Sequence, residues 1–201
     1  MDIYWILLAV TEVIAVIILI VVLASNADLF GLFQPGERRA GKRGEKMASK
    51  VIRRALHSGD RMLTNVCVEY DGKPAELDNV IINRYGVFII EVKNYKGRLE
   101  GGEDDYEWHK YKITHAGNEY EKPVKNPIKQ VKRQTYVLAH YLEVNGARVW
   151  IRGYAMLLEG NSPVESEYVL KNTADVERAI HTKARETLDE ETVERIELLL
   201  K

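Results

Sequence analysis

The sequence predicts an α/β protein in which helices flank a mixed sheet and a transmembrane helix comes first. Strand-like runs follow one another with short turns between them: MLTNVCVEY, ELDNVIIN and VFIIEVK. Segments of helical periodicity stand before and after these runs, and a long apolar run opens the chain. Four parts follow from these patterns: an anchor at 1–25, a linker at 26–36, a domain at 37–160, and a C-terminal strand and helices at 161–201 that pack on the domain.

Composition limits the chain to a single domain beside the membrane segment. It has 201 residues, of which 46% are hydrophobic, and a formal net charge of -1. No global field therefore favours a polyanionic partner. The single cysteine, Cys67, cannot form an internal disulfide, and its place in an alternating run predicts a thiol packed in the core.

Residues 3–24 have the length and apolarity of a helix that spans a bilayer, with Tyr4 and Trp5 placed as interfacial anchors. A cleaved signal peptide fits less well, because no basic residue precedes the run and the run exceeds the usual apolar region. Residues 36–54 carry eight Lys or Arg against two Glu, so the positive-inside rule predicts a single-pass protein with its C-terminal domain in the cytoplasm. Glu12, near mid-membrane, indicates self-association of the anchor or a tolerated protonated acid rather than transport.

The segment 37–57 is predicted to be helical, with one apolar face and basic residues opposite. Helical steps back along that face place Glu45 at its amino-terminal edge. An acid in this position is either a site residue or a first-turn glutamate that the helix dipole favours.

The strands form an antiparallel meander with turns at Asp71-Gly72 and at Arg84-Tyr85. If Arg84 and Tyr85 are the two central turn residues, Asp78 lies opposite Glu91 and Glu76 lies opposite Lys93. These four charges then share one face of the sheet. That face continues with Val80, Ile82, Val87 and Ile89, and the other face holds Leu77, Ile81, Phe88, Ile90 and Val92. Both faces are apolar, so both must be covered.

Two opposed carboxylates are a poor structural choice, because at about 5 Å they repel by roughly 3 kcal/mol at an effective dielectric near 20. A bound Mg²⁺ or Mn²⁺ would remove the conflict, since hard cations take carboxylate oxygens and can activate water. Lys93 could position that water or neutralise charge on a phosphate. The alternative is a surface network of Glu76, Asp78 and Lys93 where the strands leave the core.

The segments GKRGEK, ELDNVIINRYGVFIIEVKNYKG and NPIKQVKRQTYVL resemble the nuclease-related domain (NERD) family, a branch of the PD-(D/E)XK nuclease superfamily. The resemblance runs from about Gly36 to Leu158. It implies a restriction-endonuclease-like fold and a membrane-anchored, metal-dependent nuclease that hydrolyses phosphodiester bonds in DNA or RNA. The alternative is a catalytically inactive, membrane-tethered module on the same fold that binds nucleic acid or protein.

The resemblance also assigns roles to individual residues. It implies that Asp78, Glu91 and the backbone carbonyl of Val92 are ligands of a divalent cation, Mg²⁺ or Mn²⁺. It further implies that Lys93 is the catalytic lysine. Auxiliary site roles fall to Glu45 and Gln130. A homodimer formed through the anchor would bring two such sites together.

Beyond the strands, the acids of GGEDD at 101–105 predict a solvated turn, since they lack the spacing of a calcium loop. Trp108 and Tyr111 are more typical of packing than of base stacking. The five histidines lack zinc-ligand spacing and no glycine-rich phosphate loop is present, which disfavours zinc enzymes and nucleoside triphosphatases.

A helix is predicted to start at Asn126-Pro127, a cap followed by proline. Its buried stripe comprises Ile128, Val131, Thr135, Leu138 and Leu142. Its basic residues either meet a phosphate backbone or form a solvated face: Lys125, Lys129, Lys132 and Arg133. After a strand in RVWIRGYAMLLEG, helices are predicted at 173–182 and 187–200, the second opened by a capping box from Thr187 to Glu190.

Overall fold

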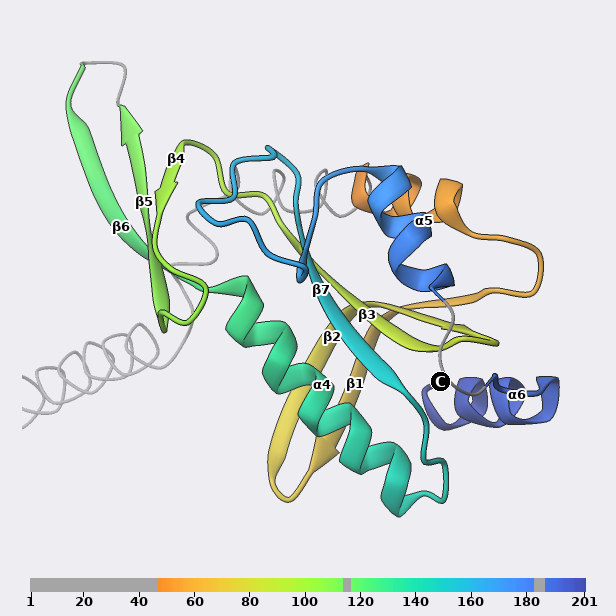
Figure 1. Cartoon of the computed structure of the whole chain (residues 1–201). Coiled ribbons are helices and arrows are strands. Elements are labelled where there is room, and N and C mark those ends of the chain that lie inside the picture. The colour runs from red at the N-terminus through yellow and green to blue at the C-terminus, as the bar shows by residue number, and fades with distance from the viewer. Residues whose placement is uncertain (1–46, 114–116, 183–186) are drawn as a thin grey trace, which may run out of the picture. The chain divides into compact units, whose positions relative to one another are not determined.

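The computed structural model describes residues 47–113, 117–182 and 187–201, all within a compact unit that runs from Arg43 to Lys201. Figure 1 shows a twisted sheet with helices on both faces and a smaller sheet beside it. The predicted anchor, the linker and Glu45 lie outside the described residues. Among the helices of the described part, none has the length and apolarity needed to cross a membrane.

The main sheet has five strands in the order β1-β2-β3-β7-β8. Their bounds are β1 Arg61–Tyr70, β2 Lys73–Asn83, β3 Gly86–Lys93, β7 Ile151–Leu157 and β8 Val169–Leu170. The first three strands pair antiparallel, and β3, β7 and β8 pair parallel. The long connection from β3 to β7 contains helix α4, Pro127–Val144, as a parallel pair requires. The predicted mixed sheet flanked by helices is confirmed.

The turn between β2 and β3 has the predicted register. Asn83 pairs with Gly86 and Ile82 with Val87, which leaves Arg84 and Tyr85 as the two central residues. The N–H of Tyr85 donates to Oδ1 of Asn83 at 2.8 Å, so the side chain of Asn83, the residue just before the turn, supports it. This ladder continues to Asn79 opposite Ile90, one step short of the predicted acids.

Helices cover both faces of the sheet, as its two apolar faces require. Helix α4 and helix α6, Glu190–Leu199, contribute Leu138, Leu142, Val193 and Ile196 to the cluster over Val80, Ile82, Val87 and Ile89. The helical segment 47–55 and helix α5, Thr173–His181, contribute Ala48, Ile52, Val176 and Ile180 to the opposite cluster over Ile81, Phe88 and Ile90. Burial of these side chains is the main stabilising contribution to the unit.

Strands β1 and β2 change face partway along. The pairing skips Asn65 and Asp78, and Asn65 has a left-handed φ of 55°. Beyond this point Val66, Val68 and Leu77 turn toward the α4 cluster. The expectation that Leu77 lies on the other face is therefore wrong. The expected core packing of Cys67 is wrong for the same reason, since its alternating neighbours now point inward and the thiol is exposed.

The smaller sheet has the order β4-β5-β6 and lies at the amino-terminal end of α4 (Figure 1). Its strands are β4 Arg98–Glu100, β5 Glu107–Ile113 and β6 Glu119–Lys125. Trp108 is fully buried in a third cluster with Leu99, Ile128 and Leu157, which confirms a packing role for this tryptophan. This cluster joins the smaller sheet to α4 and to the end of β7.

The predicted cap of α4 is confirmed and that of α6 is wrong. Asn126 caps α4 and accepts from the N–H of Ile128, with Pro127 in the first turn. Asn172 caps α5 and accepts from the N–H of Asp175 at 3.0 Å. Helix α6 begins at Glu190 with Asp189 as its cap, because the Asp189 carboxylate accepts from the N–H of Thr192 at 2.9 Å. The predicted capping box from Thr187 is therefore wrong.

Candidate active site

Asp78 and Glu91 stand near the end of the β2-β3 ladder, where the predicted register would place them opposite each other. Asp78 is half-buried, and its Oδ2 accepts a hydrogen bond of 2.8 Å from the N–H of Val92. The carboxylate of β2 therefore reaches the backbone of β3 directly beside Glu91. A charge-assisted bond of this kind fixes the position of Asp78.

Glu91 is a buried carboxylate with three donors around it. Its Oε1 accepts from Lys93 Nζ at 2.6 Å and from Gln130 Nε2 at 2.7 Å, and its Oε2 accepts from Gln134 Nε2 at 2.7 Å. The side chain of Glu91 is 3% exposed and that of Lys93 is 18% exposed, so the ammonium lies on the solvent side of the carboxylate. Such a group is tolerated inside a protein because it is paired and hydrogen-bonded.

Gln130 and Gln134 are one helical turn apart on α4 and meet Glu91 from the same side. Gln134 also donates to the carbonyl of Glu76 at 2.7 Å, so it connects β2 to β3 through its amide. The carbonyl oxygens Oε1 of both glutamines are buried without a hydrogen-bond partner. Two acceptors thus remain beside the carboxylate, which is unusual for buried polar atoms.

Gln134 is a site residue that the sequence reasoning missed. The spacing in the sequence could have identified it, because a residue four positions after Gln130 lies on the same helical face. Its polar side chain interrupts an otherwise apolar stripe, and it is 2% exposed.

Tyr95 adds a constraint on the proton chemistry of the site. Burial raises its pKa to about 12, and the negative charge of Glu91 adds to the shift. The phenol donates to the carbonyl of Lys125 at 3.1 Å. Tyr95 is therefore a neutral donor at ordinary pH that ties the segment after β3 to the last residue of β6, and it cannot act as a base there.

The structure brings together Asp78, Glu91, Lys93 and Gln130 among the predicted site residues. Val92 takes part through its N–H, which binds Asp78. Glu76 does not fit its predicted place on the shared face, because the change of face at Asn65 turns Leu77 inward and leaves Glu76 exposed. Within the described ranges no group of three or more His, Cys, Asp or Glu side chains is placed to hold a metal ion.

The residues present nevertheless suit a hard cation in their chemistry. Asp78 and Glu91 offer carboxylate oxygens, and the unpartnered Oε1 atoms of Gln130 and Gln134 offer neutral oxygens nearby. Oxygen-only donors are typical of Mg²⁺ and Mn²⁺ sites. Glu45, the third acid of the expected set, lies outside the described residues.

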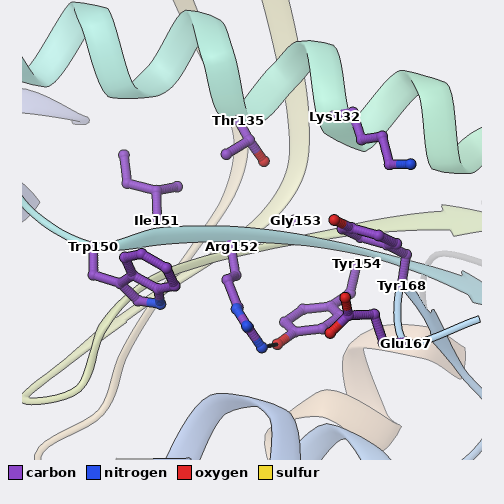
Figure 2. A pocket seen from close by; sticks show the side chains of 9 residues that line it. All are labelled: Lys132, Thr135, Trp150, Ile151, Arg152, Gly153, Tyr154, Glu167 and Tyr168. Carbon is purple, nitrogen blue, oxygen red and sulfur yellow. Dashed lines mark hydrogen bonds between the residues drawn. The ribbon is translucent and has the colours of Figure 1, made fainter. Parts of the chain in front are cut away.

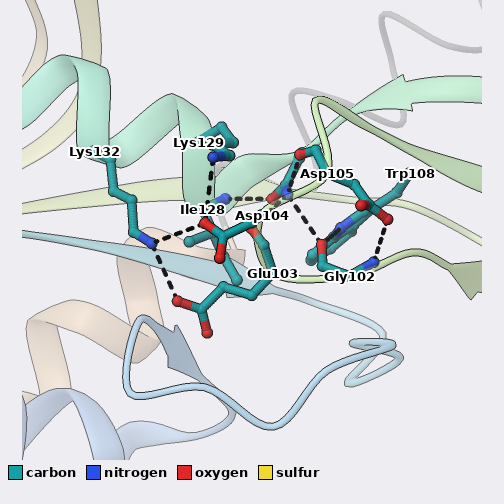
Figure 3. Close-up of polar contacts among 9 residues, drawn as sticks. Gly102, Glu103, Asp104, Asp105, Trp108, Ile128, Lys129 and Lys132 are labelled. Atoms are coloured by element: carbon teal, nitrogen blue, oxygen red, sulfur yellow. Dashed lines mark hydrogen bonds and ion pairs between the residues drawn. The ribbon is translucent and has the colours of Figure 1, made fainter.

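The basic residues of α4 are occupied by protein groups. Figure 3 shows the loop after β4 reaching α4, with Lys129 Nζ 3.3 Å from Asp104 and Lys132 Nζ 3.1 Å from Glu103. Hydrogen bonds from Ser166 and Lys132 lower the pKa of Glu103. Arg133 donates to the carbonyl of Pro74. Lys129, Lys132 and Arg133 are thus partly or fully exposed bases with protein partners.

The same loop is attached to the start of α4 rather than being a purely solvated turn. Asn126 Nδ2 donates to the carbonyls of Gly102, Glu103 and Asp105 at 3.3, 3.0 and 2.7 Å. Trp108 Nε1 donates to the carbonyl of Gly102 at 2.8 Å (Figure 3). The cap residue of α4 therefore also anchors the acidic loop.

Comparison with known proteins supports one family. The nuclease-related domain family matches residues 40–158, which is more than half of the chain. An uncharacterized protein of Bacillus anthracis is 29% identical over 104 residues, which are 51% of this chain and 48% of that protein. The chain thus spans about half the length of this curated relative. No solved structure matches the chain.

The matched segment contains the β2 acid, the β3 acid and lysine, and the α4 glutamines that the structure gathers around Glu91. The chain belongs to the nuclease-related domain family, within the PD-(D/E)XK-like nuclease superfamily.

Proposed function

We propose that this protein is a membrane-anchored, metal-dependent nuclease that hydrolyses phosphodiester bonds in DNA or RNA. The observation that supports it best is the buried Glu91 held by Lys93, Gln130 and Gln134, next to Asp78. Burying a charged group costs free energy that several partners must offset. A position that served only the apolar core would not need a carboxylate with three donors. The family provides the second support.

The protein's own residues would divide the work as follows. Asp78 and Glu91 hold the cation, with Glu45 and the Val92 carbonyl as the further ligands that the family resemblance implies. When bound, Mg²⁺ or Mn²⁺ supplies a polarised water and stabilises charge on the phosphate. Gln130 and Gln134 fix the orientation of Glu91, as groups behind a ligand do. Lys93 carries a positive charge on the solvent side of Glu91, where a phosphate would approach.

Cleavage assays test this proposal with the full chain in detergent. The substrates are single-stranded, duplex and branched DNA and RNA, each with Mg²⁺ or Mn²⁺. Asp78→Ala and Glu91→Gln should lose cleavage, whereas Glu69→Gln should not, because Glu69 is an exposed acid of β1 that pairs with Pro74, four residues from Asp78 on β2. Cleavage that persists in the Asp78 and Glu91 variants would reject the assigned site.

A second candidate function is a binding module without turnover on the same fold. It is favoured by the pairing of Glu91 with Lys93, because this ion pair compensates the carboxylate without a metal. Calorimetric titration with Mn²⁺ separates the two candidates. The nuclease binds Mn²⁺, and Lys93→Met binds it more tightly because the competing ammonium is gone. A module without turnover binds little Mn²⁺ in either form.

Membrane anchoring is part of the proposal and rests on the apolar run 3–24 with basic residues after it. We propose that this run places the described unit at the cytoplasmic surface and that Glu12 promotes pairing of two anchors. Crosslinking in membranes would compare wild type with Glu12→Leu. Equal yields of crosslinked dimer would remove Glu12 from the proposal.

A further inference from the structure

A cavity of about 280 Å³ opens at the edge of the main sheet, near the lower end of the volumes of small-molecule pockets. It lies between α4, the first half of β7 and the segment before β8 (Figure 2). Its walls combine aromatic rings and cations with one acid. The residues that carry the argument are Lys132, Trp150, Arg152, Tyr154, Glu167 and Tyr168.

The cavity exists because β8 is short. β8 pairs only with Ala155 and Met156, so among the described residues the first half of β7 has no strand neighbour on that side. The N–H of Ala155 points to this side and bonds the carbonyl of Tyr168 at 2.7 Å. Alternation places the N–H of Gly153 on the same side. The wall of the cavity is therefore an open strand edge.

Gly153 lets α4 approach this edge closely. A Cβ at this position would lie 2.6 Å from Thr135 Oγ1 and 2.9 Å from the carbonyl of Val131. Because both are shorter than any normal contact, only glycine allows α4 to form the roof. The close approach of α4 to Gly153 thus fixes one wall of the cavity.

Arg152 is the distinctive cation of this cavity. It is exposed, its guanidinium lies 5.6 Å from the ring of Trp150, and Nη1 is 3.5 Å from the hydroxyl of Tyr154. No carboxylate of the described residues lies within 4.0 Å of it, whereas Lys132 is paired with Glu103. The hydroxyl of Tyr154, first, and the charge of Glu167 raise the pKa of Arg152, but no carboxylate in the described part of the chain forms a direct ion pair with it, so its remaining N–H groups can bind a phosphate.

The aromatic rings supply a surface for a base. Trp150 is 56% exposed, an unusual state for so large an apolar side chain. The ring of Tyr168 lies 4.6 Å from Lys132 Nζ on the other wall. Exposed rings beside a cation are the elements by which proteins hold single nucleotides of a strand, because every base has a face that stacks. Glu167 adds an acceptor of the type that binds an exocyclic amino group.

We propose that this cavity binds one nucleotide unit, with Arg152 on its phosphate and Trp150 stacked on its base. The unit is either a free nucleoside monophosphate or one residue of a nucleic-acid strand. The inference extends the proposed nuclease function by naming a second contact for its substrate. It concerns residues outside the Asp78 and Glu91 site, and its test needs no cleavage.

Binding is measured by titration of the full chain in detergent with excess chelator, so that no strand is cut. The probes are nucleoside monophosphates, a short single-stranded oligonucleotide, inorganic phosphate and an acidic peptide. The variants are Arg152→Gln and Trp150→Ala. Their matched controls are Arg148→Gln, whose side chain is 90% exposed, and Tyr106→Ala, at 86% exposed.

We expect both cavity variants to weaken nucleotide or oligonucleotide binding at least about fivefold, as the loss of one stacked base does. The controls should bind as wild type does. An effect on monophosphates identifies a free nucleotide, and an effect on the oligonucleotide alone identifies a strand residue; both support the proposal. Equal binding by cavity variants and controls overturns it. So does inorganic phosphate or the acidic peptide binding as well as nucleotides.

Binding in chelator separates this inference from the proposed function, because it requires neither the cation nor cleavage. A wild-type protein that binds nucleotides through Arg152 and cuts no substrate would reject the nuclease function and leave the cavity assignment in place. Cleavage that depends on Glu91, with no role for Arg152 in binding, would reject the cavity assignment and leave the nuclease function in place.

Discussion

Replacement of Lys93 by methionine tests whether the ion pair with Glu91 stabilises the fold. Methionine keeps most of the apolar stem and removes the charge, so packing changes little. Glu91 then keeps two neutral donors, Gln130 and Gln134, but loses its only ion-pair partner within 4.0 Å among the described residues. Breaking a buried pair costs about 3–5 kcal/mol. Lys93 is 18% exposed, which reduces the expected loss to about 2 kcal/mol.

The magnitude is measured by a double-mutant cycle with Glu91→Gln. Denaturant unfolding of the full chain in detergent at neutral pH gives the free energy of unfolding of the four forms. In the Glu91→Gln background the Lys93→Met loss should shrink to about 0.5 kcal/mol, because no buried charge is left behind. Equal losses in both backgrounds would refute the reasoning, since Lys93 would then act through packing alone.

The remaining predictions concern the cap, the cavity roof and the buried phenol. Asn126→Ala should lower the free energy of unfolding by about 3 kcal/mol, because the cap of α4 and the hydrogen bonds to the loop carbonyls are lost together. Asn172→Ala, which removes a cap alone, should cost about 1 kcal/mol. Equal losses in denaturant unfolding would contradict the anchoring role of Asn126. Gly153→Val should destabilise by at least about 2 kcal/mol and abolish nucleotide binding, and a stable variant would show that α4 can move away. The folded pKa of Tyr95, about 12, exceeds its usual 10.0, so the protonated phenol favours the folded state; between these values rising pH should destabilise wild type relative to Tyr95→Phe. Ultraviolet titration of the two proteins checks the raised pKa of Tyr95. A phenolate band near pH 10 that is present in wild type and absent from Tyr95→Phe would contradict it.

The core of the candidate site was predictable because it depends on one turn. Placing Arg84 and Tyr85 at the centre of the β2-β3 turn sets the whole register, and the ladder from Asn83 to Asn79 follows it. The apolar faces of β3 followed from simple alternation. Helix α4 was equally accessible, since Asn126 and Pro127 form a strong start signal.

Features that depend on a single backbone conformation or on distant pairing were not predictable. The left-handed φ of Asn65 reverses the faces of β1 and β2, which moved Leu77 inward and Cys67 outward against the alternating pattern. Asparagine tolerates a positive φ, but its presence in a sequence does not predict one. The pairing of Lys132 with Glu103 joins segments far apart in the chain, so no local pattern indicates it.

The interruption of pairing at Asn65 also links the outermost strand, β1, to the position of Asp78 on β2. Because regular pairing is interrupted at Asp78, its carboxylate can turn toward β3. A β-branched residue at 65 would adopt the left-handed φ of 55° only at a cost in free energy, so we expect it to favour regular pairing there. The position of the Asp78 carboxylate thus depends on an uncharged residue of the neighbouring strand.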